Sequence, residues 1–226
     1  MATPHHGDGG CAQPAGAWPT WVLSNHDNPR HRTRYGGDER IARAAAVLLL
    51  SLRGTPFLYA GEEFGMGDAA PTDPPRDPAG RDGCRSPIAW TATPPHGWRG
   101  VTPWLPFGTD ASTANPEVQA DDPTSMLSLY RAMLQLRRAE AALHRGEIRL
   151  VPVAGHRSLL AFDRIAEDRA LRVLVNMGED AIPLAPHLAP GILGERGGSI
   201  LIRSDPAATT SDVPGALAPY EAAVLG

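Results

Sequence analysis

Apolar residues in the first half of the chain form two short runs and one long periodic segment. Residues 21–24 (Trp-Val-Leu-Ser) and 55–59 (Thr-Pro-Phe-Leu-Tyr) are typical of short buried strands, and each ends in a polar cluster. Between them, residues 38–53 repeat apolar positions at spacings of three and four, which predicts a helix. Its predicted buried face holds Ile41, Ala44, Ala45, Leu48, Leu49 and Leu52. The order strand, polar loop, helix, strand, polar loop is typical of parallel α/β units.

A second periodic segment predicts a helix over residues 123–139. Asp122 is expected to cap this helix, and Pro123 suits its first position. Its predicted buried stripe holds Met126, Leu129, Tyr130, Met133 and Leu136. Residues 65–123 are dense in Pro and Gly and show little periodicity. A loop of that length in a compact domain indicates a functional or packed excursion.

After Gly146 the pattern changes to short apolar runs separated by turn residues. The runs are 148–153, 159–162, 171–175, 199–202 and 222–225. They predict a small antiparallel β-sandwich of about 80 residues, and so a domain boundary near residue 145. Residues 1–17 are small, polar and aperiodic, which predicts a disordered lead-in. The chain is therefore expected to divide into 1–17, 18–145 and 146–226.

Composition and charge exclude several classes of function. All 21 basic residues are Arg, so the chain offers no lysine for a phosphate loop or a Schiff base. A net charge of −4 argues against nucleic acid as a partner. The two cysteines, Cys11 and Cys84, match neither a disulfide framework nor zinc spacing, and no metal or cofactor is expected. The longest apolar run, 44–50, is too short to span a membrane, and no signal peptide is recognisable. We therefore expect a cytoplasmic protein without membrane contact.

The strongest candidate site is Asn25-His26-Asp27, which follows the first predicted strand. A carboxylate and an imidazole at a strand end can bind sugar hydroxyls and stabilise positive charge developing at an anomeric carbon. The alternative is that Asn25 and Asp27 only cap a turn and that His26 is an ordinary surface histidine. A further alternative pairs Asp27 with Glu62 or Glu63 as a complete retaining dyad, which needs carboxyl groups ~5–5.5 Å apart.

The segment 21–30, Trp-Val-Leu-Ser-Asn-His-Asp-Asn-Pro-Arg, resembles the last signature region of the α-amylase family of glycoside hydrolases, and in particular of its α-glucosidase branch. Further matching stretches follow in the order of the family, at residues 48–66, 81–90 and 103–106. The resemblance implies an α/β fold: the C-terminal fragment of a (β/α)8 TIM barrel, reduced to its last two strand–helix units, followed by the β-sandwich.

The resemblance also implies roles for individual residues. Asp27 corresponds to the third catalytic carboxylate, which stabilises the transition state, and His26 to a residue that binds the sugar. Arg30 is expected to line the mouth of the cleft. Arg81 and Arg85 are expected to brace the long loop through charge-assisted hydrogen bonds to carboxylates.

The nucleophilic Asp and the acid/base Glu of the family stand on strands upstream of the Asn-His-Asp region, and no matching segment occurs in this sequence. The resemblance thus implies an α-glucosidase of small α-glucosides whose present chain is catalytically incomplete. A truncated gene, a misplaced start and a split enzyme with an upstream partner chain are all compatible with this. The rival class is a non-catalytic carbohydrate-binding or interaction module. Glu62 and Glu63 are implied to be structural.

Overall fold

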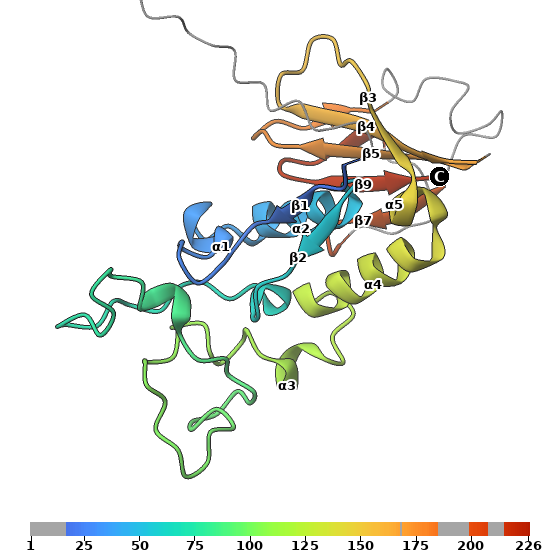
Figure 1. The fold of residues 1–226 in the computed structure, drawn as a ribbon. Coiled ribbons are helices and arrows are strands. Elements are labelled where there is room, and N and C mark those ends of the chain that lie inside the picture. Colours follow the sequence, from blue (N-terminus) through green and yellow to red (C-terminus); the bar gives the residue numbers. More distant parts are fainter. Residues whose placement is uncertain (1–16, 168, 185–198, 208–214) are drawn as a thin grey trace, which may run out of the picture.

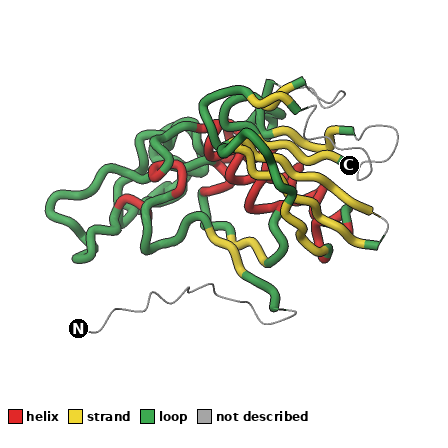
Figure 2. Tube along the Cα trace, turned by 90° about the horizontal axis from the view of Figure 1, so that it is seen from above, coloured by secondary structure: helices red, strands yellow, loops and turns green. Residues whose placement is uncertain are grey.

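The computed structural model describes residues 17–167, 169–184, 199–207 and 215–226. A layer of helices lies against one face of an antiparallel sheet, and a long loop region projects away from both (Figures 1 and 2). The predicted lead-in lies outside the described residues, except for Ala17. Among the described helices, none combines the length and the apolar character that a membrane crossing requires.

The two predicted strands of the first half form a parallel pair. Strands β1 (Thr20–Val22) and β2 (Thr55–Phe57) pair with Thr20 opposite Thr55 and Val22 opposite Phe57. The helix α2 (Glu39–Ser51) connects them, which confirms the predicted α/β unit. The side chain of Asp38 caps α2 by accepting a hydrogen bond from the backbone N–H of Arg40.

The buried surface of α2 differs from the predicted face. The most buried positions are Ala42, Ala46, Val47 and Leu50. Four residues of the predicted face, Ile41, Ala45, Leu48 and Leu52, are only half buried. The periodicity predicts one apolar stripe, but α2 contacts a second helix and a sheet at once, so burial extends around most of its circumference.

The remaining helices are short, apart from one. They are α1 (His31–Arg34), α3 (Pro116–Gln119), α4 (Met126–Ala139) and α5 (Ala141–Arg145), with 3₁₀ turns η1 (Glu62–Phe64) and η2 (Gly83–Arg85). The prediction that Asp122 caps α4 is wrong. The side chain of Ser125 accepts from the backbone N–H of Ser128, so that α4 begins three residues later than predicted. Asp122 instead accepts from the backbone N–H of Thr124 at 2.8 Å.

After residue 146 the described residues form an antiparallel sheet in the order β3-β4-β5-β9-β7, and a separate pair β6-β8. The strands are β3 (Glu147–Leu150), β4 (Leu159–Ala166), β5 (Arg169–Asn176), β6 (Ile182–Pro183), β7 (Ile200–Arg203), β8 (Ala216–Leu217) and β9 (Ala222–Leu225). The predicted antiparallel strands are confirmed. The predicted sandwich is not confirmed, because one face of the larger sheet packs on helices.

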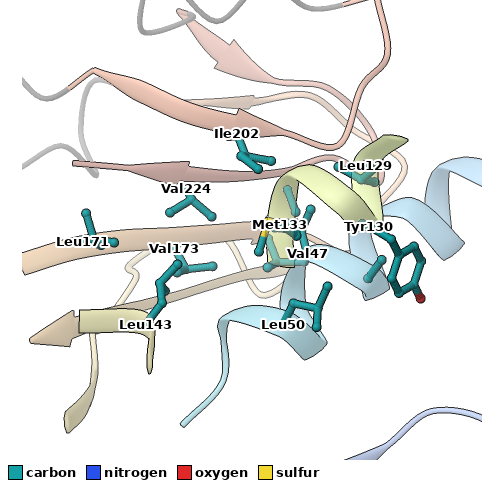
Figure 3. Packing of buried hydrophobic residues seen from close by; sticks show 14 of the residues in the cluster. Val47, Leu50, Leu129, Tyr130, Met133, Leu143, Leu171, Val173, Ile202 and Val224 are labelled. Atoms are coloured by element: carbon teal, nitrogen blue, oxygen red, sulfur yellow. The ribbon is translucent and has the colours of Figure 1, made fainter. Parts of the chain in front are cut away.

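The main hydrophobic core lies between the helices and the sheet (Figure 3). Helical residues such as Val47, Met133 and Leu143 meet strand residues such as Val173 and Val224, all nearly inaccessible to solvent. The opposite face of the sheet packs against β6 and β8 through a second cluster. Helices from before residue 145 and strands from after it therefore share one core.

Candidate active site

A tight turn after β1 presents the Asn-His-Asp motif. The side-chain oxygen of Asn25 accepts hydrogen bonds from the backbone N–H groups of Asp27 at 2.9 Å and Asn28 at 3.0 Å. It also accepts one from the side-chain amide of Asn28 at 3.1 Å. These bonds reverse the chain and leave the side chains of His26 and Asp27 66% and 49% exposed. Asn25 is thus the residue that shapes the turn, while His26 and Asp27 are open to a ligand.

Three side chains contact the carboxylate of Asp27. Arg81 donates from Nη1 to Oδ1 at 2.5 Å, and Arg85 donates from Nη2 to the same oxygen at 3.4 Å. The Nε2 of His26 lies 3.3 Å from Oδ2. Arg85 also donates from Nε to the backbone carbonyl of His26 at 2.8 Å. The prediction that Arg81 and Arg85 brace the long loop through charge-assisted hydrogen bonds to a carboxylate is confirmed.

A second carboxylate holds Arg81 from its other side. Asp77 accepts from Nε of Arg81 at 2.6 Å and from Nη2 at 3.1 Å, and it is only 6% exposed. The hydrogen bond from Arg81 lowers the pKa of Asp77. The carboxylate of Asp82 in turn accepts from the backbone N–H of Asp77 at 2.8 Å. Sequence reasoning missed Asp77, although its position four residues before Arg81 was a usable signal.

Arg30 does not line a cleft, contrary to the expectation drawn from the sequence. Its side chain is 2% exposed, donates to the carbonyl of Ala60 at 2.9 Å and stacks 4.6 Å from the ring centre of Tyr59. Its backbone N–H donates to Asp68 at 2.8 Å. Burial lowers the pKa of Arg30. The guanidinium thus joins the turn after β1 to the loop after β2, because these loops follow neighbouring parallel strands.

A cavity of about 310 Å³ opens beside Asp27, between the turn after β1 and the long loop. Its lining includes Asp27, Asp68, Pro71, Gly80, Arg81 and Cys84. The cavity therefore combines carboxylate acceptors with guanidinium donors, which suits a ligand rich in hydroxyl groups.

A buried polar chain lies behind the turn. Ser24 and His31 are linked by a hydrogen bond of 2.9 Å between Oγ and Nδ1, and Tyr130 donates to Glu62 at 2.9 Å. His31 and Glu62 lie 4.0 Å apart, between Nδ1 and Oε2. Burial raises the pKa of Glu62 to about 7 and lowers the pKa of His31 to about 4. His31 follows β1 and Glu62 follows β2. Side chains that follow parallel strands lie at the same edge of the sheet, and the same reasoning predicted Asp27 as a site residue.

The alternative dyad of Asp27 with Glu62 or Glu63 has no support. The carboxylate of Glu62 has no exposed surface and cannot reach a sugar. Glu63 accepts a hydrogen bond from the backbone N–H of Gly61 at 2.8 Å. Both glutamates hold the loop after β2, which is the structural role that the resemblance implied.

Among the residues that the structure describes, no group of three or more His, Cys, Asp or Glu side chains is arranged to hold a metal ion. The chemistry available at the turn is that of one carboxylate, one imidazole and two guanidinium groups. Such a set can accept hydrogen bonds from sugar hydroxyls, donate to sugar oxygens and place a negative charge near a developing cation.

Known proteins similar to this chain include glucoside hydrolases and a transporter subunit. A probable α-glucosidase of Rhizobium meliloti is 38% identical over 184 residues, which cover 75% of this chain and 33% of that protein. The amino acid transporter heavy chain SLC3A1 of Mus musculus is 32% identical over 173 residues, 76% of this chain and 25% of that protein. The chain thus spans a quarter to a third of the length of these relatives.

A solved structure shares the fold of this chain. The α-glucosyl transfer enzyme XgtA superposes with a TM-score of 0.78 and 33% sequence identity, and the match covers 92% of this chain and 40% of the XgtA chain. The family profile of the α-amylase catalytic domain matches residues 10–146. This match covers more than half of the sequence and includes the turn after β1, so the chain belongs to the α-amylase family.

Proposed function

We propose that the chain acts in carbohydrate metabolism and supplies part of the active site of a retaining α-glucosidase for small α-glucosides. Asp27 binds hydroxyl groups of the sugar on the cleaved side and stabilises the oxocarbenium-like transition state, and His26 hydrogen-bonds the same sugar. The observation that carries the proposal is the half-exposed carboxylate of Asp27, beside His26, at a strand end next to the cavity.

Arg81 and Arg85 act on the sugar through Asp27 in this proposal. Both guanidinium groups contact the same oxygen, Oδ1, so the orientation of the carboxylate is set from one side. The other oxygen, Oδ2, faces His26 and remains available to a hydroxyl group of the sugar. Arg81 is itself held by buried Asp77, so the arrangement is rigid before a ligand arrives.

The chain by itself is proposed to be inactive. A retaining mechanism needs a nucleophilic carboxylate and an acid/base carboxylate in addition to Asp27. The family carries both on strands that precede the Asn-His-Asp region, so the site is complete only together with those strands. We place the reaction in the cytoplasm, because the buried thiol of Cys84 is free, as is usual in a reducing compartment.

The test is complementation between two polypeptides. The part of the Rhizobium meliloti α-glucosidase that this chain does not match is produced separately, and hydrolysis of p-nitrophenyl α-glucoside is measured. We expect activity only in the mixture, and a loss of roughly 10²-fold or more with Asp27→Asn, because an electrostatic contact to the transition state disappears.

The control for this test is Asp121→Asn, which neutralises an exposed carboxylate away from the turn. It is expected to retain full activity in the mixture. Activity of the chain alone, or equal activity of the two variants, contradicts the proposal.

A non-catalytic carbohydrate-binding or interaction module is the second candidate. The observation in its favour is the similarity to SLC3A1, whose name describes a transporter heavy chain and not a hydrolase. Isothermal titration of the chain with maltose separates the two candidates. Heat of binding that Asp27→Asn abolishes, together with an inactive mixture, favours the binding module.

A further inference from the structure

Asp68 belongs to the loop after β2 and lines the cavity beside Asp27. Its Oδ1 accepts a hydrogen bond from the backbone N–H of Arg30 at 2.8 Å, and its own backbone N–H donates to Oγ1 of Thr33 at 2.8 Å. Both bonds fix Asp68 against the turn after β1 and the helix α1. The side chain is therefore held in place, half buried, in the wall of the cavity.

The second oxygen of Asp68, Oδ2, differs from the oxygens of the buried carboxylates nearby. Arg81 donates to both oxygens of Asp77, and each oxygen of Asp82 accepts from a backbone N–H. Among the described residues, hydrogen bonds to Asp68 reach only Oδ1. The neighbouring guanidinium of Arg30 donates to a backbone carbonyl instead, and burial raises the pKa of Asp68. Oδ2 is therefore an acceptor that a donor in the cavity can satisfy.

The cavity suits a neutral ligand with several hydroxyl groups. Carboxylates contribute to its wall from two loops, at Asp27 and Asp68, and both require hydrogen-bond donors. The guanidinium of Arg81 is already engaged by Asp27 and Asp77. A carboxylate or phosphate group on the ligand would lie beside two negative charges, which weakens binding. The rest of the wall is small and apolar and suits the C–H faces of a sugar ring; it includes Pro29, Ala69, Pro71 and Ala79.

We propose that Asp68 determines specificity: its Oδ2 accepts a hydrogen bond from a hydroxyl group of the sugar in the cavity, and its charge rejects sugars that carry a carboxylate or a phosphate. The ligand class is neutral α-glucosides. The inference rests on the proposed function in one respect, namely that the cavity beside Asp27 holds an α-glucoside.

The experiment is calorimetric titration of the full chain with two sugars, methyl α-glucoside and methyl α-glucuronide. They differ only at C6, where a neutral CH₂OH group is replaced by a carboxylate. The unmodified chain is expected to bind the glucoside at least about tenfold more tightly. Asp68→Asn is expected to weaken binding of the glucoside about fivefold, because a charged acceptor is lost, and to reduce the preference to less than about threefold.

The control is Asp121→Asn, which removes an exposed carboxylate outside the cavity lining and should leave both affinities unchanged. A preference that Asp68→Asn leaves unchanged overturns the proposal. So does an unmodified chain that binds no methyl α-glucoside.

A purely structural role of Asp68 is tested by a second variant and by thermal unfolding of each protein. Asn at position 68 retains an oxygen for the backbone N–H of Arg30, so Asp68→Asn is expected to unfold at the temperature of the unmodified chain. Asp68→Glu keeps the charge and is expected to keep the preference at about tenfold or more, even where it weakens both sugars. Loss of the preference in Asp68→Glu as well would assign the effect to the bond with Arg30 and overturn the proposal.

Sugar selection and hydrolysis separate this proposal from the proposed function. A preference that depends on Asp68, in a chain whose mixture hydrolyses no α-glucoside, supports the role of Asp68 and contradicts the hydrolase. Hydrolysis that Asp27→Asn abolishes, with a preference that Asp68→Asn leaves unchanged, supports the hydrolase and overturns the role of Asp68.

Discussion

Buried arginines join segments of this chain that are far apart in sequence. Arg43 donates to the carbonyls of Ser204 at 2.6 Å and Thr124 at 3.0 Å. Arg137 donates to the carbonyls of Leu50 and Gly54, both at 2.6 Å. The planar guanidinium has five N–H donors, so one side chain can satisfy two carbonyls at once, which a lysine ammonium does with less precise geometry. The exclusive use of Arg therefore has a structural consequence in the core.

Glu62 makes the stability of the fold depend on pH. Its pKa rises from an ordinary 4.5 to about 7, so the folded state binds a proton that the unfolded state releases between these values. Its contribution to stability is therefore present at low pH and is lost as pH rises through about 7. The free energy of unfolding of Glu62→Gln is expected to rise relative to that of the unmodified chain by up to about 3 kcal/mol between pH 5 and pH 8. Urea unfolding at a series of pH values measures this difference.

The difference in unfolding free energy between the unmodified chain and Glu62→Gln, followed against pH, separates the contribution of Glu62 from that of its neighbour His31. His31 has a pKa lowered to about 4, so its contribution is present above its ordinary value of 6.5 and is lost as pH falls towards 4. That slope is common to both proteins and cancels in the difference. Parallel curves for Glu62→Gln would count against the assigned burial effect.

At the scale of elements, the start of α4 depends on a serine and not on the nearby aspartate. The hydroxyl of Ser125 accepts from the backbone N–H of Ser128 at 3.1 Å and donates to the carbonyl of Gln119 at 2.9 Å. It therefore ties the first turn of α4 to the end of α3. Asp122 shapes the preceding turn through Thr124.

Ser125→Ala is expected to destabilise the chain by about 1–2 kcal/mol, because the helix loses its N-cap. Asp122→Ala is expected to cost less than about 0.5 kcal/mol, because this residue is exposed and lies outside α4. Urea unfolding monitored by circular dichroism measures both values. A larger loss for Asp122→Ala than for Ser125→Ala would restore Asp122 as the cap.

At the scale of the whole molecule, one core joins the helical layer and the sheet. Met133 of α4 is inaccessible to solvent and belongs to the same cluster as Val47 of α2 and Val173 of β5 (Figure 3). The cluster connects parts that the sequence assigns to different domains. Stability of the helices and of the sheet is therefore coupled.

Met133→Ala is expected to cost about 2–5 kcal/mol, because it removes buried atoms and leaves a cavity in a close-packed core. Hydrogen exchange should accelerate together in α2 and β5, since both line that cavity. Met177→Ala, at a residue that is 53% exposed, is the control and should leave both unchanged. Faster exchange in α2 alone would contradict a shared core.

Local chemistry made much of the fold predictable. The periods of apolar residues located α2, α4 and the antiparallel strands, because spacing alone reveals which positions share a face. The turn at Asn25 was predictable for a similar reason, since a short amide side chain after a strand hydrogen-bonds its own backbone. The buried positions of Arg30 and Glu62 were not predictable, because burial depends on which distant segments cover a charge.

The sequence by itself determined the helices, the strands and the family motif with Asp27 and His26, since these depend on residue type and spacing. Only the tertiary structure decided that Arg81 and Arg85 converge on Asp27, that Arg30 is a buried brace, and that Ile41, Ala45 and Leu48 of α2 stay only half buried. Each of these depends on contacts between loops or elements that the backbone brings together, and no local pattern encodes such contacts.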